Sequence, residues 1–125
     1  MEGVFQITGW DENNYQNGPD EQKKSLAKIT QNYQGDFEGT SEVQYLMSYQ
    51  SSAEAVFVGF EVFTGKIGQV SGSVTFQHTG TFKNGVASSE FTVVEGAGTE
   101  GLSQLTGCGR FESGEHGQAK YQFDV

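Results

Sequence analysis

The stretch that decides the fold is residues 57–94, F-V-G-F-E-V-F-T-G-K-I-G-Q-V-S-G-S-V-T-F-Q-H-T-G-T-F-K-N-G-V-A-S-S-E-F-T-V-V. It contains three runs rich in Phe, Val and Thr, separated by Gly68-Gln69 and by Asn84-Gly85. Asn-Gly between such runs is the strongest short-range hairpin signal, and Gly in the first of two turn positions suits a type II′ turn. The stretch therefore predicts three antiparallel strands joined by two tight turns.

These turns fix the register of the three strands, and the register determines which side chains lie on the same face of the sheet. Glu61 is predicted to lie opposite Phe76, and His78 opposite both Gly59 and Phe91. Antiparallel sheets usually solvate only one side, so the aromatic face should be the interior. The inward side chains are then Phe57, Glu61, Phe63, Val74, Phe76, His78, Phe82, Ala87, Phe91 and Val93. A carboxylate and an imidazole are thus expected inside an aromatic core.

Glu61 and His78 are the candidate functional pair. They are diagonal neighbours on adjacent strands, within reach of a hydrogen bond between their side chains. Because an isolated buried charge loses several kcal/mol of hydration, each side chain should find the other, a water or a ligand. The pair could be structural, could anchor a ligand, or could act as a general acid and base. One histidine and one glutamate do not make a metal site, and no cofactor is expected.

The leading functional hypothesis is a barrel that binds a small apolar or amphipathic molecule. Glu61 and His78 would be its polar anchors, with apolar walls from Phe57, Phe63, Phe76 and Phe91. One alternative is an isomerase or cyclase in which the same pair moves a proton, and another is a structural oligomer with a filled barrel. Four tyrosines could add hydroxyl groups to the pocket: Tyr33, Tyr45, Tyr49 and Tyr121. The usual place of such a residue, however, is half-buried at the rim of a barrel.

The rest of the chain adds strands and loops but no helix. Alternating apolar residues or β-branched content predict further strands at Val4–Trp10, Lys23–Tyr33 and Val43–Tyr49, and a last hairpin in Cys108–Val125. Ala55–Phe63 belongs to the first of the three strands described above. Polar or glycine-rich loops are predicted at Asp11–Asp20 and Glu95–Gly107, and a bulge or bend at Gly35–Gly39. About eight strands favour an all-β fold closed into a small antiparallel barrel, because closure removes exposed edges.

Composition limits the class of partner. The chain of 125 residues, with 18 Gly and 10 Phe against a single Pro, suits one β domain. A net charge of −9 disfavours binding to nucleic acid or to anionic membranes. No apolar run is long enough for a membrane span and no export signal is visible, so a cytoplasmic protein is expected. The single cysteine, Cys108, excludes an intramolecular disulfide and is expected to be a small buried residue.

The same alternation places four large apolar side chains on the outside of one strand: Val56, Val58, Phe60 and Val62. Exposed apolar rows usually mark association, so this strand is expected to pack against another copy in a homodimer or trimer. The alternative is that the N-terminal segment around Trp10 covers the row within one chain.

Several stretches resemble a known bacterial family. They are Gly35–Gly39, Gly59–Glu61, Gly72–Phe82 and Gly98–Leu102, with Gln77-His78-Thr79-Gly80 the most specific. Together they resemble domain-of-unknown-function family 3224, which is assigned to the allene oxide cyclase-like β-barrel. Glu95 and Ala97 stand where that family more often has Pro and Ser, and Phe91 where it tends to have Trp. The resemblance implies an eight-stranded barrel with room for a small ligand, and it supplies no established activity.

Overall fold

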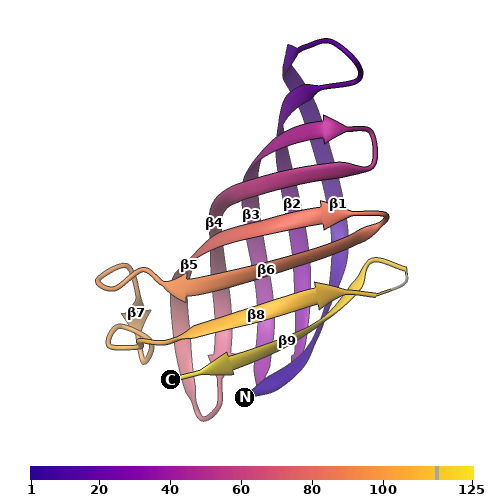
Figure 1. Cartoon of the computed structure of the whole chain (residues 1–125). Coiled ribbons are helices and arrows are strands. Elements are labelled where there is room, and N and C mark those ends of the chain that lie inside the picture. Colours follow the sequence, from indigo (N-terminus) through magenta and orange to yellow (C-terminus); the bar gives the residue numbers. More distant parts are fainter. Residues whose placement is uncertain (115) are drawn as a thin grey trace.

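The described part of the chain folds into nine β-strands (Figure 1). The structure is a computed structural model that describes residues 1–114 and 116–125. The strands are β1 Glu2–Asn17, β2 Lys23–Gly35, β3 Phe37–Ser51, β4 Glu54–Ile67, β5 Val70–Lys83, β6 Val86–Val93, β7 Thr99–Glu100, β8 Cys108–Ser113 and β9 Gln118–Asp124. No helix is present among these described residues, and hence none that could cross a membrane.

Eight of these strands close into an antiparallel barrel. Their order is β4-β3-β2-β1-β9-β8-β6-β5, and a further pairing of β4 with β5 completes the circle. The two-residue β7 adds to β5 inside the loop between β6 and β8. The predicted all-β closed barrel of eight strands is therefore confirmed, while the likeness to allene oxide cyclase stays an expectation of the resemblance.

The register of the meander formed by β4, β5 and β6 is as predicted. Ile67 pairs with Val70 and Lys83 with Val86, so both turns have two residues. Asn84 and Gly85 have φ values of 51° and 82°, the left-handed conformation that both central residues of a type I′ turn require. Glu61 accordingly lies opposite Phe76, while His78 lies opposite Gly59 on one side and Phe91 on the other.

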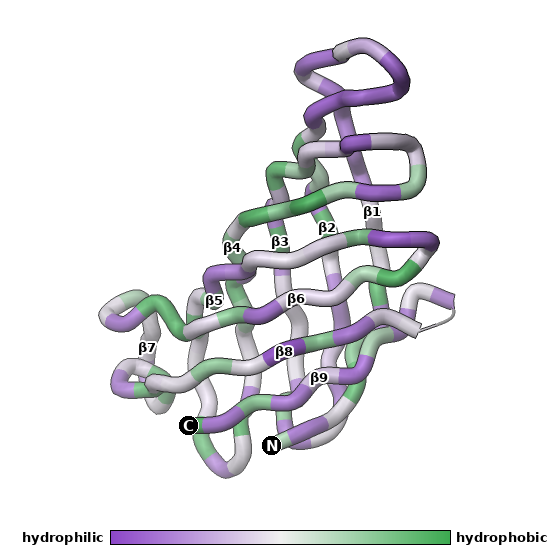
Figure 2. Tube along the Cα trace, in the orientation of Figure 1, coloured by the Kyte–Doolittle hydropathy of each residue, from purple (hydrophilic) through white to green (hydrophobic). Residues whose placement is uncertain are grey.

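The first strand is longer than predicted. The polar stretch Asp11–Asp20 was expected to be a loop, but β1 continues to Asn17 and stays paired with β2 as far as Lys23. Strand β9 pairs with β1 only from Glu2 to Gln6, so the β1–β2 hairpin rises beyond the closed barrel (Figure 1). Its hydrophilic colour in Figure 2 gives the reason: a hairpin solvated on most sides has no need of alternating apolar residues.

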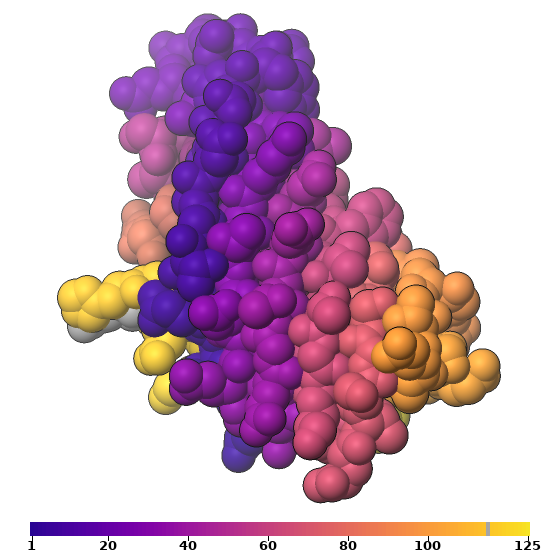
Figure 3. All heavy atoms as spheres, turned by 180° about the vertical axis from the view of Figure 1, so that it is seen from behind, coloured from indigo at the N-terminus to yellow at the C-terminus, as the bar shows by residue number. Residues whose placement is uncertain are grey.

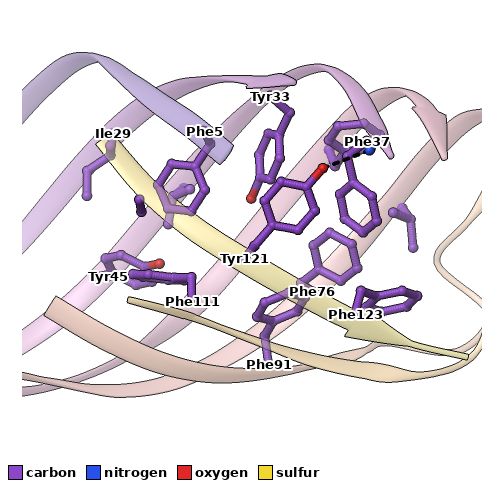
Figure 4. Close-up of a cluster of buried hydrophobic side chains, with 14 of the residues drawn as sticks. Phe5, Ile29, Tyr33, Phe37, Tyr45, Phe76, Phe91, Phe111, Tyr121 and Phe123 are labelled. Atoms are coloured by element: carbon purple, nitrogen blue, oxygen red, sulfur yellow. Dashed lines mark hydrogen bonds between the residues drawn. The ribbon is translucent and has the colours of Figure 1, made fainter. Parts of the chain in front are cut away.

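The interior is filled by aromatic rings. Phe37, fully buried, has five rings within 4.8 to 6.0 Å of its own, centroid to centroid, and Figure 4 shows several of them around it. Glycines make room for rings from facing strands. A β-carbon at Gly109 would lie 2.6 Å from the Phe91 ring, and one at Gly80 would collide with Phe57. Glycine facing an aromatic residue is thus part of how this barrel packs.

Tyr121 ties the last strand, β9, to the bend between β2 and β3. Its hydroxyl accepts a hydrogen bond from the Phe37 backbone N–H at 2.8 Å and donates one to the Gln34 carbonyl at 3.0 Å. These two residues flank the bend at Asp36, where a bulge or bend was predicted. The bend therefore places Phe37 in the core.

Candidate functional site

The predicted contact between Glu61 and His78 is present. Nε2 of His78 lies 2.7 Å from Oε1 of Glu61, and each residue is 1% exposed. Glu61 comes from β4 and His78 from β5, as diagonal neighbours in the register described above. The two hairpin turns thus bring the carboxylate and the imidazole together inside the barrel.

Two further side chains complete the partners of this pair. The Tyr33 hydroxyl donates to Oε2 of Glu61 at 2.5 Å, and Nδ1 of His78 lies 2.9 Å from Oγ of Ser89. Ser89 in turn can donate to the carbonyl of Glu90 at 3.2 Å. Both carboxylate oxygens and both ring nitrogens are therefore engaged, and the chain of bonds joins β2, β4, β5 and β6. We call Tyr33, Glu61, His78 and Ser89 the central polar cluster.

Tyr45 lies beside this cluster with its hydroxyl unpartnered. Among the described residues, Tyr45 Oη is the one buried side-chain nitrogen or oxygen without a hydrogen-bond partner. Gly59 separates Tyr45 from His78 across the sheet, and its missing side chain lets the two rings meet edge to face at 5.5 Å. Burial and the neighbouring Glu61 carboxylate raise the pKa of Tyr45 well above its ordinary value, so its phenol is neutral at physiological pH.

The four predicted apolar walls are buried but packed against other rings. Phe76 and Phe91 lie 4.9 Å apart between ring centroids, Phe57 lies 4.5 Å from Tyr45, and Phe63 lies 5.3 Å from Tyr33. A ligand among these four rings would have to displace side chains. The part of the rings in binding therefore stays a prediction.

Three hollows of the structure lie outside the barrel. Two of about 1050 and 510 Å³ lie over the outer face of β5, β6, β8 and β9, where Glu90 and Arg110 line both. A third of about 310 Å³ lies near the turn between β1 and β2. None of the three is lined by Glu61, His78 or Tyr45.

A second polar cluster, which sequence reasoning missed, lies in the extension of the first hairpin. Ser25 and Tyr49 donate to Oε2 of Glu12 at 2.5 and 2.9 Å, and Trp10 Nε1 donates to Oε1 at 3.1 Å. Burial opposes ionisation of Glu12, but these three donors and nearby Lys23 outweigh it and lower the pKa of the carboxyl. Glu12 was missed because its segment was read as a loop. Its pairing with Ala27 places it on the inner side.

Other predicted site features divide into those that agree with the structure and those that do not. Cys108 was expected to be buried and is exposed, because the strand alternation that turns Phe111 inward turns Cys108 outward. His116 is exposed, as expected of a hairpin tip. The described residues contain no group of three or more His, Cys, Asp or Glu side chains placed to hold a metal ion.

The outward row on β4 is exposed in the single chain. Val56, Val58, Phe60 and Val62 are between 45% and 55% exposed, and Leu46, the neighbour of Val58 on β3, adds to them. The alternative in which the Trp10 segment covers this row is wrong, since β1 pairs with β2 and β9 and Trp10 is itself 48% exposed. Figure 2 shows the hydrophobic stretch in β4, and Figure 3 shows the face on which β1 to β4 lie side by side.

The tyrosines predict a loss of stability at high pH. Burial, with the Glu12 carboxylate as a further cause at Tyr49, raises the pKa of Tyr49 and of Tyr121 from 10.0 to about 12. The unfolded chain loses these protons first, so the free energy of unfolding should hold below pH 10 and fall as the pH rises toward 12. Urea unfolding at a series of pH values, with tyrosinate absorbance, measures this. Ionisation of all the tyrosines near pH 10 without unfolding would contradict it.

The fold and the site define a class of protein: a closed barrel of eight strands with a hydrogen-bonded polar cluster at its centre. The family model described as "Protein of unknown function (DUF3224)" matches residues 1–125, and the chain belongs to this family. The chain is also similar to a crystal structure of a protein of unknown function from that family in Shewanella oneidensis MR-1. The TM-score is 0.81 at 25% identity, over 98% of this chain and 92% of the other. Among curated proteins, none matches.

Proposed function

We propose that this protein binds a small amphipathic molecule inside the barrel and that Tyr45 makes its polar contact. The observation that carries the proposal is the unpartnered hydroxyl of Tyr45, a residue only 4% exposed. Leaving a buried hydroxyl without a hydrogen bond costs about 1–3 kcal/mol. Native proteins hold few such groups, and those that persist call for an explanation such as a water, an ion or a functional contact. A ligand oxygen at Tyr45 would remove this cost.

The surroundings of Tyr45 favour an apolar body for such a molecule. The Phe57 ring lies 4.5 Å from the Tyr45 ring, centroid to centroid, and Met47, two residues further along β3, is buried on the same face of the strand. Because rings fill the interior, binding requires a side chain to move. Met47 suits this role, since methionine is unbranched, flexible and adapts to irregular spaces.

The central polar cluster supports this site without needing to touch the ligand. With every polar atom of Glu61 and His78 engaged, the pair holds β4, β5 and β6 in place and fixes the His78 ring against Tyr45. A proton-shuttling role in an isomerase or cyclase would first require one of these hydrogen bonds to be released. The geometry therefore favours binding over catalysis.

A second candidate function is assembly, and the exposed apolar row on β4 favours it. Val56, Val58, Phe60 and Val62 would be covered by another copy of the chain, with the filled barrel acting as a rigid body. Such a role is compatible with ligand binding, because the row and Tyr45 lie on opposite faces of the sheet.

Native mass spectrometry of the purified protein tests both candidates in one experiment. We expect an oligomer carrying a small mass that is lost on denaturation, and we expect Tyr45→Phe to carry less of it. Phe60→Glu should give a monomer of 13.6 kDa, while Val86→Glu, at an exposed valine outside this row, should not. Bare protein under every condition would contradict ligand binding, and a wild-type monomer at every concentration would contradict assembly.

A further inference from the structure

We infer that the ligand offers an uncharged hydrogen-bond acceptor, a ketone-type carbonyl oxygen, to the hydroxyl of Tyr45. This inference rests on the proposed binding function and adds the chemical class of the ligand. It begins from the hydrogen-bonding capacity of the site. A neutral tyrosine hydroxyl has one O–H to donate, and in this barrel that donor has no acceptor. A carbonyl oxygen is the simplest group that satisfies it.

The charges facing the site argue against an anion. The Glu61 carboxylate is fully buried, and its influence reaches Tyr45, whose phenol it helps to keep neutral. An anion here would lose its hydration beside the Glu61 carboxylate, and the basic side chain of the cluster, His78, is already paired with Glu61. Glu12, on the inner side of the first hairpin, is a further negative charge near that end of the barrel.

The same inventory argues against a cationic amine. A primary ammonium group carries three N–H donors, all of which need acceptors once it leaves water. The Glu61 carboxylate is already paired with His78 and also accepts from Tyr33. An ammonium buried beside Tyr45 would therefore lose its hydration without gaining an unpaired counter-ion. A neutral carbonyl on an apolar chain leaves no donor of its own unsatisfied.

Isothermal titration of three probes with equal carbon number tests the inference: decanone, decanoate and decylamine. We expect decanone to bind about tenfold more tightly than either charged probe. Tyr45→Phe should weaken decanone binding about fivefold to tenfold, the value of one hydrogen bond, and leave any binding of decanoate unchanged. Tyr15→Phe, at an exposed tyrosine, serves as the matched control and should bind decanone as the wild type does.

A second measurement guards against a variant that merely unfolds. Without ligand, Tyr45→Phe should unfold at a temperature no lower than the wild type, because it removes an unpaired buried hydroxyl. Tyr33→Phe should unfold at a lower temperature, because it takes a donor from Glu61.

The outcomes separate the inference from the function on which it rests. If none of the three probes binds, the proposed binding function itself fails. If decanoate binds as tightly as decanone, or if Tyr45→Phe leaves decanone binding intact, binding stands and the assignment of the ligand class is overturned.

Discussion

Replacing Glu61 with alanine is expected to lower the free energy of unfolding by about 3–5 kcal/mol, the usual effect of removing one partner from a buried pair. The substitution leaves the Tyr33 hydroxyl and Nε2 of His78 without an acceptor, in residues that are 5% and 1% exposed. Because both groups are buried, neither can form a replacement hydrogen bond with water in the folded state. Urea unfolding followed by circular dichroism measures the loss.

Two variants show whether this loss comes from the buried contacts. Glu90→Ala removes an exposed glutamate from β6 and should change stability by no more than about 0.5 kcal/mol. Replacing both Glu61 and His78 with apolar residues of similar size should be less harmful than removing Glu61 alone, since no charge is then left unpaired. A loss below about 1 kcal/mol for Glu61→Ala would mean that the cluster is not a structural element of the core.

Replacing Phe37 with alanine is expected to cost about 3–5 kcal/mol through the cavity it leaves among five neighbouring rings. Phe37 is fully buried and follows directly on the bend at Asp36. Chemical denaturation again supplies the measurement. The midpoint should fall while the slope of the transition stays near that of the wild type.

Phe60→Ala is the matched control for Phe37→Ala, because it makes the same chemical change at a ring that is 55% exposed. In the isolated chain it should cost well under half as much, since the ring at position 60 is not enclosed by others. Equal losses at the two positions would mean that Phe60 is covered in solution, as the proposed assembly requires. Unfolding at several protein concentrations separates these cases, because the stability of an oligomer depends on its concentration.

The meander and the Glu61–His78 contact could be predicted because local signals determine them. Asn84-Gly85 and Gly68-Gln69 each fix a register between consecutive strands, and alternation then assigns every side chain to a face. The same reasoning identified the outward row on β4. For these features the information lies within a few residues of each turn.

Tyr33, Ser89 and the unpartnered state of Tyr45 could not be predicted in the same way. Tyr33 reaches Glu61 from a strand two places away in the sheet, which depends on the curvature of the closed barrel. An unpaired hydroxyl is a property of everything that surrounds it. The inward position of Glu12 could not be predicted for a different reason: a polar hairpin beyond the barrel carries no apolar periodicity.

The pairing of the first strand with the last has a consequence for how the chain is made. The amino group of Met1 donates to the carbonyl of Phe123 at 2.7 Å, across 122 residues of sequence. Until β9 has left the ribosome, β1 and β8 each expose an unpaired strand edge. The barrel can therefore close only once β9 has been made, and contacts between such distant residues make closure slow. In that interval a nascent chain needs protection from its neighbours more than the finished barrel ever does.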